Sequence, residues 1–118
     1  ASTSATAMPE ARLAAGIWVS TYLRRLALAG IPAYVTRHGD DTAGAVLVKC
    51  ATLDGRASLW AREWDLDTDQ RLWVRLNEGA ERDIDAQIAR QTARDPDLWV
   101  VEIESRDART LLDEPGLA

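Results

Sequence analysis

The 118-residue sequence contains no phenylalanine and only one each of cysteine, histidine, lysine and methionine. A single cysteine excludes an internal disulfide and predicts a reducing, cytoplasmic location. No apolar run approaches the ~18 residues of a membrane-spanning helix, and the N-terminal stretch lacks the charged and apolar regions of a signal peptide. Glycine-rich phosphate loops of the P-loop or dinucleotide type are also absent. We therefore predict no cofactor and no membrane partner.

The sequence also lacks an excess of basic residues. Its net charge is -5, and the acidic excess lies in the second half. Residues 1–50 carry a net charge of +2 and residues 51–118 a net charge of -7. Neither half supplies the strongly basic surface by which proteins bind nucleic acid. We expect no nucleic-acid partner.

What the sequence does contain is the composition of a folded globular protein, with 47% hydrophobic and 28% charged residues and five tryptophans. Its length suits one domain, which we place at residues 12–114. Residues 1–11 are expected to be a disordered tail, with Met8 a candidate natural start, and residues 115–118 a second tail.

Hydrophobic periodicity predicts the elements. Helical spacing extends from Arg12 to Ala29, with an apolar stripe that includes Val19 and Leu26. Strand-like runs at residues 32–38, 45–53, 56–64 and 71–76 are joined by short turns, which favours an antiparallel meander. A polar helix with a thin stripe at Ile84 and Ile88 follows within residues 77–97, and then a strand at 98–104.

Residues 105–112 fit either a turn with a sixth strand or a terminal helix. The predicted fold class is α+β: an antiparallel or mixed sheet of five to six strands, with a long N-terminal helix packed on one face and a second polar helix.

Three segments carry a family resemblance: IWVSTYLRR, RHGDDTAGAVLVK and DPDLWVVEIESRDARTLLDE. They are similar to a small bacterial family catalogued as domain of unknown function 1491, over about residues 12–114. Its first pattern is matched by Arg37, Gly39, Asp40, Ala43 and Gly44, and its second by Asp95, Pro96, Asp97, Trp99, Glu102 and Glu104. The family often has Asp-Gly in its last turn, where this chain has Asp107-Ala108. The resemblance implies the final hairpin but no established activity.

The first candidate site is the loop formed by Arg37, His38, Asp40 and Asp41. A carboxylate that holds one imidazole nitrogen leaves the other free as a base or ligand. The alternative is a turn in which Gly39 adopts a positive φ and the aspartates cap the backbone. The turn is favoured because Gly and Asp clusters between strands are typical of turns.

Neither Cys50 nor the acidic loop at 65–69 predicts chemistry. Cys50 lies in a run patterned for burial on both faces, and Lys49 beside it points to the opposite face, so we expect an inert buried thiol. Asp65, Asp67 and Asp69 resemble the start of a calcium loop, but the required Gly and Glu are absent later in it. With one histidine in the chain, we predict no metal site and no catalytic residue.

A second candidate site is the charged cluster around the last predicted strand: Asp95, Asp97, Glu102, Glu104 and Arg106. Paired carboxylates serve acid–base chemistry when one of them is desolvated. The alternative is the solvated face of an edge strand, where charge blocks aggregation.

Trp60 and Trp73 form a candidate interface. Alternation places both indoles opposite the face that carries Leu59 and Leu72, and arginines flank them, as in many interface hot spots. The alternative is that the polar helix after Asn77 covers them. Base stacking on these residues is disfavoured by the nearby acidic charge.

The leading functional interpretation is therefore a small, non-enzymatic cytoplasmic module for protein interaction or regulation, with a protein partner or a weak homodimer centred on Trp60 and Trp73. The second interpretation is a small-ligand-binding or hydrolytic domain, which would use the Arg37–Asp41 loop together with Asp95, Asp97 and Arg106.

Overall fold

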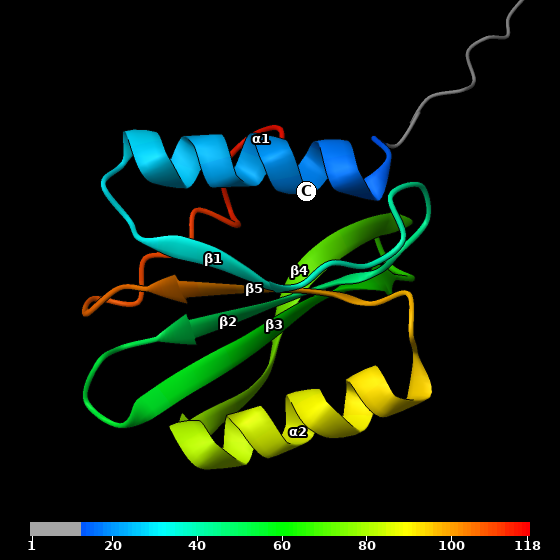
Figure 1. The fold of residues 1–118 in the computed structure, drawn as a ribbon. Helices are drawn as coiled ribbons and strands as arrows, with labels where there is room; N and C mark the ends of the chain where they lie inside the picture. Colours follow the sequence, from blue (N-terminus) through cyan, green and yellow to red (C-terminus); the bar gives the residue numbers. More distant parts are fainter. Residues whose placement is uncertain (1–12) are drawn as a thin grey trace, which may run out of the picture.

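Two helices and one five-stranded sheet make up the computed structural model, which describes residues 13–118. In chain order the elements are α1 (Ala15–Leu28), β1 (Ala33–Arg37), β2 (Val46–Ala51), β3 (Arg56–Asp65), β4 (Gln70–Ala80), α2 (Glu81–Arg94) and β5 (Trp99–Glu104). Helix α1 lies on one side of the sheet and α2 on the other (Figure 1). The predicted α+β class with a mixed sheet is confirmed. The expected tail at residues 1–11 lies outside the described residues.

The strand order is β1-β5-β2-β3-β4. Strands β2, β3 and β4 form the predicted antiparallel meander. The expectation that β1 continues this meander is wrong, because β5 lies between β1 and β2, antiparallel to β1 and parallel to β2. Strand β5 takes this central position because its first three residues are all buried, as is typical of an interior strand. It is therefore not the solvated edge strand considered above.

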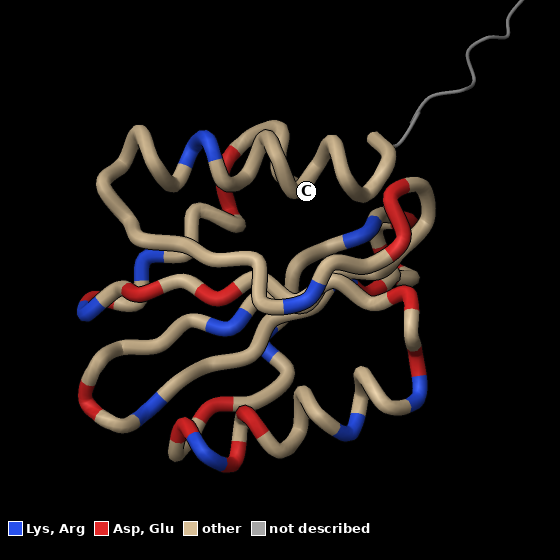
Figure 2. Tube along the Cα trace, viewed as in Figure 1, with Lys and Arg blue, Asp and Glu red and all other residues tan. Residues whose placement is uncertain are grey.

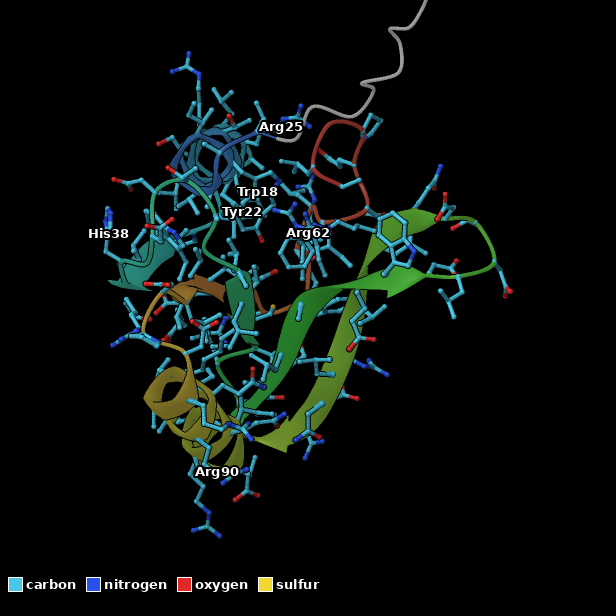
Figure 3. All side chains as sticks on the ribbon, turned by 90° about the vertical axis from the view of Figure 1, so that its right-hand side faces the viewer. Trp18, Tyr22, Arg25, His38, Arg62 and Arg90 are labelled. Atoms are coloured by element: carbon cyan, nitrogen blue, oxygen red, sulfur yellow. The ribbon has the colours of Figure 1, made fainter. Side chains whose placement is uncertain are left out.

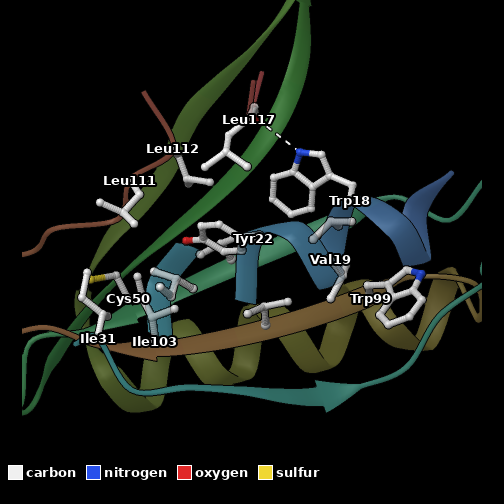
Figure 4. Packing of buried hydrophobic residues seen from close by; sticks show 14 of the residues in the cluster. Trp18, Val19, Tyr22, Ile31, Cys50, Trp99, Ile103, Leu111, Leu112 and Leu117 are labelled. Atoms are coloured by element: carbon white, nitrogen blue, oxygen red, sulfur yellow. Dashed lines mark hydrogen bonds between the residues drawn. The ribbon is translucent and has the colours of Figure 1, made fainter. Parts of the chain in front are cut away.

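The larger core lies between α1 and the sheet. Trp18, Val19, Tyr22 and Leu26 of α1 are buried against apolar residues of β2 and β5 (Figure 4). Side chains three and four residues apart share one helix face, so the spacing of these four residues produces a continuous apolar stripe. Burying such a stripe is the main source of stability for a helix on a sheet.

The C-terminal segment completes this core and corrects two expectations. Residues 105–112 form neither a helix nor a sixth strand, and residues 115–118 are not a free tail. Leu111, Leu112 and Leu117 are buried in the α1 core. We call residues 110–117 the C-terminal strap.

Side chains of α1 and β4 bind the strap through its backbone. Tyr22 Oη donates to Thr110 O at 2.8 Å and Arg25 to Pro115 O at 2.6 Å. The indole N–H groups of Trp18 and Trp73 both donate to Leu117 O, at 3.3 and 2.7 Å. These bonds satisfy carbonyl groups that a segment without regular structure cannot pair by itself. Patterns that predict hairpins or helices cannot predict this arrangement, because the strap has no regular structure and its partners are distant in sequence.

Helix α2 covers the other face. Ile84 is fully buried against Leu47, Ala57, Leu59 and Leu98, and Ile88 packs at the margin of the same cluster. This confirms the predicted apolar stripe. The helix begins at Glu81 because β4 continues through Ala80, four residues beyond the strand predicted from the sequence. Among residues 13–118, no helix is long and apolar enough to cross a membrane.

Candidate functional site

The two motifs of the family resemblance meet where the chain enters β5. The Asp40 N–H donates to Asp97 O at 3.0 Å, and the Trp99 N–H to Ala45 O at 2.8 Å. The Trp99 indole N–H donates to Asp40 O at 2.8 Å, and the Arg37 guanidinium to Pro96 O at 3.3 Å. We call this contact between residues 37–45 and 95–99 the loop junction. It joins segments more than fifty residues apart mainly through their backbones.

Two glycines allow this close approach. A Cβ atom on Gly39 would lie 2.3 Å from Asp97 O, and one on Gly44 would lie 2.4 Å from the same atom. The expectation that Gly39 has a positive φ is wrong, because the glycines with positive φ are Gly30, Gly55 and Gly116. The physical requirement at Gly39 is space for the Asp97–Trp99 backbone.

The aspartates of the loop junction mostly cap its turns. Asp40 Oδ2 accepts hydrogen bonds from the N–H groups of Thr42 and Ala43, and Asp95 Oδ1 accepts one from the Asp97 N–H. The backbone of the same loop also satisfies α1, because the Ala15 and Gly16 N–H groups donate to the carbonyls of Thr42 and Asp41. These contacts are those of a turn that caps a helix N-terminus.

His38 and Asp41 are the polar pair left at the surface. His38 Nε2 lies 2.9 Å from Asp41 Oδ1, and their side chains are 67% and 75% exposed. The imidazole centre is 4.0 Å from the ring of Trp99. Figure 3 shows His38 at the outer side of the molecule. An exposed pair of this kind is well hydrated, so its contact contributes little to stability.

The charged cluster predicted around β5 is divided by the strand itself. Asp95 and Asp97 lie before β5, beside the loop junction, whereas Arg106 follows its far end. A six-residue strand spans about 20 Å, so Arg106 cannot join the Arg37–Asp41 loop. The structure thus brings Asp95 and Asp97 to the loop, as the second interpretation requires, and separates Arg106 from it.

Glu102 takes part in a buried charge centre that sequence reasoning missed. Lys49 is only 3% exposed, and its Nζ donates to Glu81 and Asp85, both at 2.7 Å. Glu102 lies 3.5 Å from the same atom. Burial by itself lowers the pKa of Lys49, but the hydrogen bonds to Asp85 and Glu81 and the charge of Glu102 outweigh it, so that pKa is raised.

This charge centre connects β2, β5 and α2. Figure 2 shows acidic positions gathered at the start of α2, near the sheet. The sequence signal for it was a lone lysine in an apolar strand, combined with acidic residues four apart on a polar helix. Because Lys49 is fully engaged by carboxylates, its function here is to hold the three elements together.

Cys50 is buried, as predicted. Burial raises the pKa of the thiol, and a hydrogen bond with Ser58 offsets this only in part. The thiol therefore stays protonated and packs as an apolar group. In the β3–β4 turn, Asp65 accepts hydrogen bonds from the Asp67 N–H and the Thr68 hydroxyl. Residues 13–118 contain no group of three His, Cys, Asp or Glu side chains arranged to hold a metal ion.

The expectation that Trp60 and Trp73 point away from the core is wrong. Both lie on the α1 side of the sheet, partly buried against its core. The centres of the Trp73 and Trp18 rings are 5.1 Å apart. The Arg62 guanidinium lies 4.8 Å from the centre of the Trp18 ring and 5.0 Å from that of Trp73, and Figure 3 shows Arg62 close to Trp18. The cover is provided by α1 and the strap, not by the polar helix considered before. These tryptophans are used mainly inside the chain.

The outer edge of β1 is open instead, as is that of β4 at the other end of the sheet. No strand among residues 13–118 pairs with either edge. The Glu104 N–H donates to Pro32 O, so the alternation of an antiparallel ladder directs the N–H and C=O groups of Ala33 and Val35 away from β5. The side chains of Tyr34 and Val35 are 52% and 38% exposed.

A groove follows this edge between α1 and β1. It consists of two shallow hollows of about 680 and 410 Å³, which share Leu23. Ile17, Ser20, Val35, His38 and Trp99 contribute to the first; Ala27, Gly30, Ile31, Pro32 and Ala33 contribute to the second. We call it the α1–β1 groove. Its lining is mostly apolar or small, with the His38–Asp41 pair at one end.

Comparisons with known proteins give a consistent result. A family model described as "Protein of unknown function (DUF1491)" matches residues 13–113. A crystal structure of a DUF1491 family protein from Caulobacter crescentus CB15 is similar, with 43% identity over 87% of this chain and 95% of that chain and a TM-score of 0.76. A solution structure of a protein from A. tumefaciens has 33% identity over 85% of this chain and 92% of that chain, with a TM-score of 0.71. No curated protein matches the sequence.

Proposed function

The chain belongs to the DUF1491 family of proteins of unknown function, and we propose that it is a non-enzymatic, cytoplasmic protein-interaction module that binds an extended segment along β1. The observation that carries this proposal is the unpaired edge of β1 beside the α1–β1 groove. An exposed strand edge offers a row of N–H and C=O groups to which an extended peptide adds as a further strand. The cytoplasmic location is supported by the single buried thiol, which needs no oxidising compartment.

The chemistry of the edge indicates the kind of segment that fits. Residues 32–36 contain no charged side chain, so charge does not protect this part of the edge from pairing. A register shift between Val35 and Arg37 limits the regular part of the edge to residues 33–35. The groove is lined by apolar and small residues on both of its walls. An extended, uncharged segment with apolar side chains at alternate positions would pair with Ala33 and Val35 and place every second side chain in the groove.

A ligand-binding or hydrolytic function at the Arg37–Asp41 loop receives less support. Asp40 and Asp95 are engaged by backbone N–H groups within the loop junction, and Arg106 lies at the other end of β5. The pair that stays exposed, His38 and Asp41, borders the α1–β1 groove. We propose that this pair marks one end of the peptide groove.

A selection from displayed linear peptides tests the function. We expect enrichment of peptides with alternating apolar residues, and NMR titration of one of them should shift the signals of Ala33, Val35 and Leu23. Val35→Pro should abolish binding, because it removes an outward N–H group. The internal ladder should survive, since proline is tolerated where a strand's N–H faces away from its sheet.

The matched control is Leu66→Pro, at an 85% exposed residue in the β3–β4 turn, because β4 forms the opposite edge of the sheet from β1. The φ of Leu66 is not positive, so proline is compatible with the turn, and the folded fraction of both proline variants is measured first. Selected peptides that bind Val35→Pro as well as the unchanged protein would overturn the proposal. So would shifts centred on the loop junction or the strap while β1 is unaffected.

A further inference from the structure

We propose that one occupant of the β1 edge is β1 of a second copy of this chain, paired antiparallel about a two-fold axis at Val35. This inference rests on the function proposed above, because it uses the same edge and groove. It also moves the weak homodimer expected at Trp60 and Trp73 to a surface that residues 13–118 leave uncovered.

The first support is the symmetry of the strand. β1 contains five residues, Ala33–Arg37, with Val35 at its centre; its register with β5 is regular up to Val35 and shifts between Val35 and Arg37. Val35 directs its N–H and C=O groups outward. When such a residue pairs with itself across a two-fold axis, each N–H donates to the other copy's C=O, which is the closed hydrogen-bonded pair of an antiparallel ladder. Self-pairing therefore uses the outward N–H and C=O groups of β1 and leaves the hydrogen bonds between β1 and β5 unchanged.

The second support is the side-chain pattern that this register creates. Tyr34 lies across from Thr36 of the second copy, where the register with β5 shifts, and an aromatic next to a β-branched residue is a favourable cross-strand pair. The two-fold axis places the two Arg37 side chains at opposite ends of the paired segment, so they do not face each other. No like charges oppose one another within the paired segment.

The third support is charge complementarity beside the strands. The exposed Asp41 carboxylate lies near the N-terminus of α1. Helix α1 runs beside β1 in the opposite direction, so the C-terminal end of α1 lies near the start of β1. An antiparallel partner places the second half of its α1 beside this loop. Arg24 is exposed there, one turn from the groove residues Ser20 and Ala27. Arg24 of the second copy and Asp41 thus have opposite charges on facing elements.

The short strand also predicts the strength of the dimer. Five residues and the adjoining groove bury much less surface than the ~1,600 Å² of a stable interface, so the dimer belongs to the weak, transient class. A weak dimer leaves the edge accessible to other extended segments, as the proposed function requires.

A charge-exchange experiment tests the self-pairing. Sedimentation velocity over a wide concentration series should show a concentration-dependent increase in the sedimentation coefficient of the unchanged protein. Val35→Lys and Val35→Glu should each be monomeric over the same range, because like charges then meet at the axis. An equimolar mixture of the two variants should recover the dimer. Leu66→Lys, at a residue that is 85% exposed in the β3–β4 turn, is the control and should dimerise like the unchanged protein.

Three results would overturn the inference: an unchanged protein that is monomeric at every concentration, single variants that still dimerise, or a mixture that stays monomeric. If the monomer's Val35 amide is protected from exchange at all concentrations, a segment of the same chain occupies the edge instead. A monomeric protein whose β1 edge still binds selected peptides would contradict the self-pairing alone and leave the proposed function intact.

Discussion

Gly39 is the residue at which the loop junction has least space. The position of a Cβ atom there lies 2.3 Å from Asp97 O and 2.6 Å from Trp99 Cδ1. Both neighbours are fixed, since Asp97 O accepts a hydrogen bond from Asp40 and the Trp99 indole donates one to Asp40 O. A larger residue therefore has to displace backbone and not a flexible side chain.

We expect Gly39→Ala to lower the free energy of unfolding by about 1–3 kcal/mol or more, as overpacking of a rigid site does. Gly79→Ala is the matched control, because a Cβ atom there meets nothing within 4 Å and its φ is not positive. It should change stability by no more than about 1 kcal/mol, since alanine also restricts the unfolded chain. Urea unfolding of the two variants measures the difference.

His38→Ala gives the complementary result for the same loop. Its side chain is mostly exposed, so its removal should cost within about 0.5 kcal/mol. Equal losses of stability for Gly39→Ala and Gly79→Ala would show that close approach is not the requirement at Gly39. A loss for His38→Ala as large as that for Gly39→Ala would show that the imidazole is part of the packing.

At the scale of elements, Lys49 connects the sheet to α2. Two hydrogen bonds of 2.7 Å reach Glu81 and Asp85 on that helix, and Glu102 of β5 lies near the same ammonium group. Helix α2 otherwise depends on the packing of Ile84 and Ile88. A polar helix with so narrow an apolar stripe gains much from a charge contact that specifies its position.

Lys49→Met should destabilise the protein by about 1–3 kcal/mol near neutral pH, because charged hydrogen bonds are lost and carboxylates are left without their partner. The folded pKa of Lys49 is raised above its unfolded value. Its contribution is therefore complete below the unfolded pKa, near 10.4, and decreases as the pH rises through the folded value.

Urea unfolding of the unchanged protein and Lys49→Met at several pH values up to the alkaline range tests this. The difference between the two should be constant near neutrality and shrink at high pH. Burial also raises the pKa of Tyr22, but this residue is present in both proteins and cancels in the difference. A difference that grows with alkaline pH would contradict the assigned direction.

The whole molecule shows how far the sequence could predict the fold. Periodicity alone predicted α1, α2 and all five strands, because each has an apolar pattern of its own. The position of β5 between β1 and β2 could not be predicted, since pairing between strands distant in sequence depends on contacts that no local pattern records. The strap was also missed, because its carbonyls are held by side chains of Tyr22, Arg25, Trp18 and Trp73.

The candidate sites were also predicted only in part, because local patterns do not record long-range contacts. The second functional interpretation required the two loops to lie close together, and Asp40 and Asp97 are in contact. The structural role of the loop carboxylates could not be predicted, because the sequence does not show that they accept hydrogen bonds from backbone N–H groups. Alternation correctly placed Trp60 and Trp73 on one side of the sheet and Leu59 on the other. Alternation could not show that both faces of the sheet are covered. Among residues 13–118 the outer edges of β1 and β4 stay unpaired, and the α1–β1 groove lies beside the β1 edge.

The central claim is that this protein binds its partners through the free edge of β1. Hydrogen exchange of single backbone amides, followed by NMR, tests it most directly, at low and high protein concentration and with a selected peptide. The account predicts that the Ala33 and Val35 amides exchange rapidly in the dilute free protein and are protected when β1 is paired. The Tyr34 amide, which faces β5, should be protected throughout. Binding or dimerisation that leaves the exchange of Val35 unchanged would contradict the account.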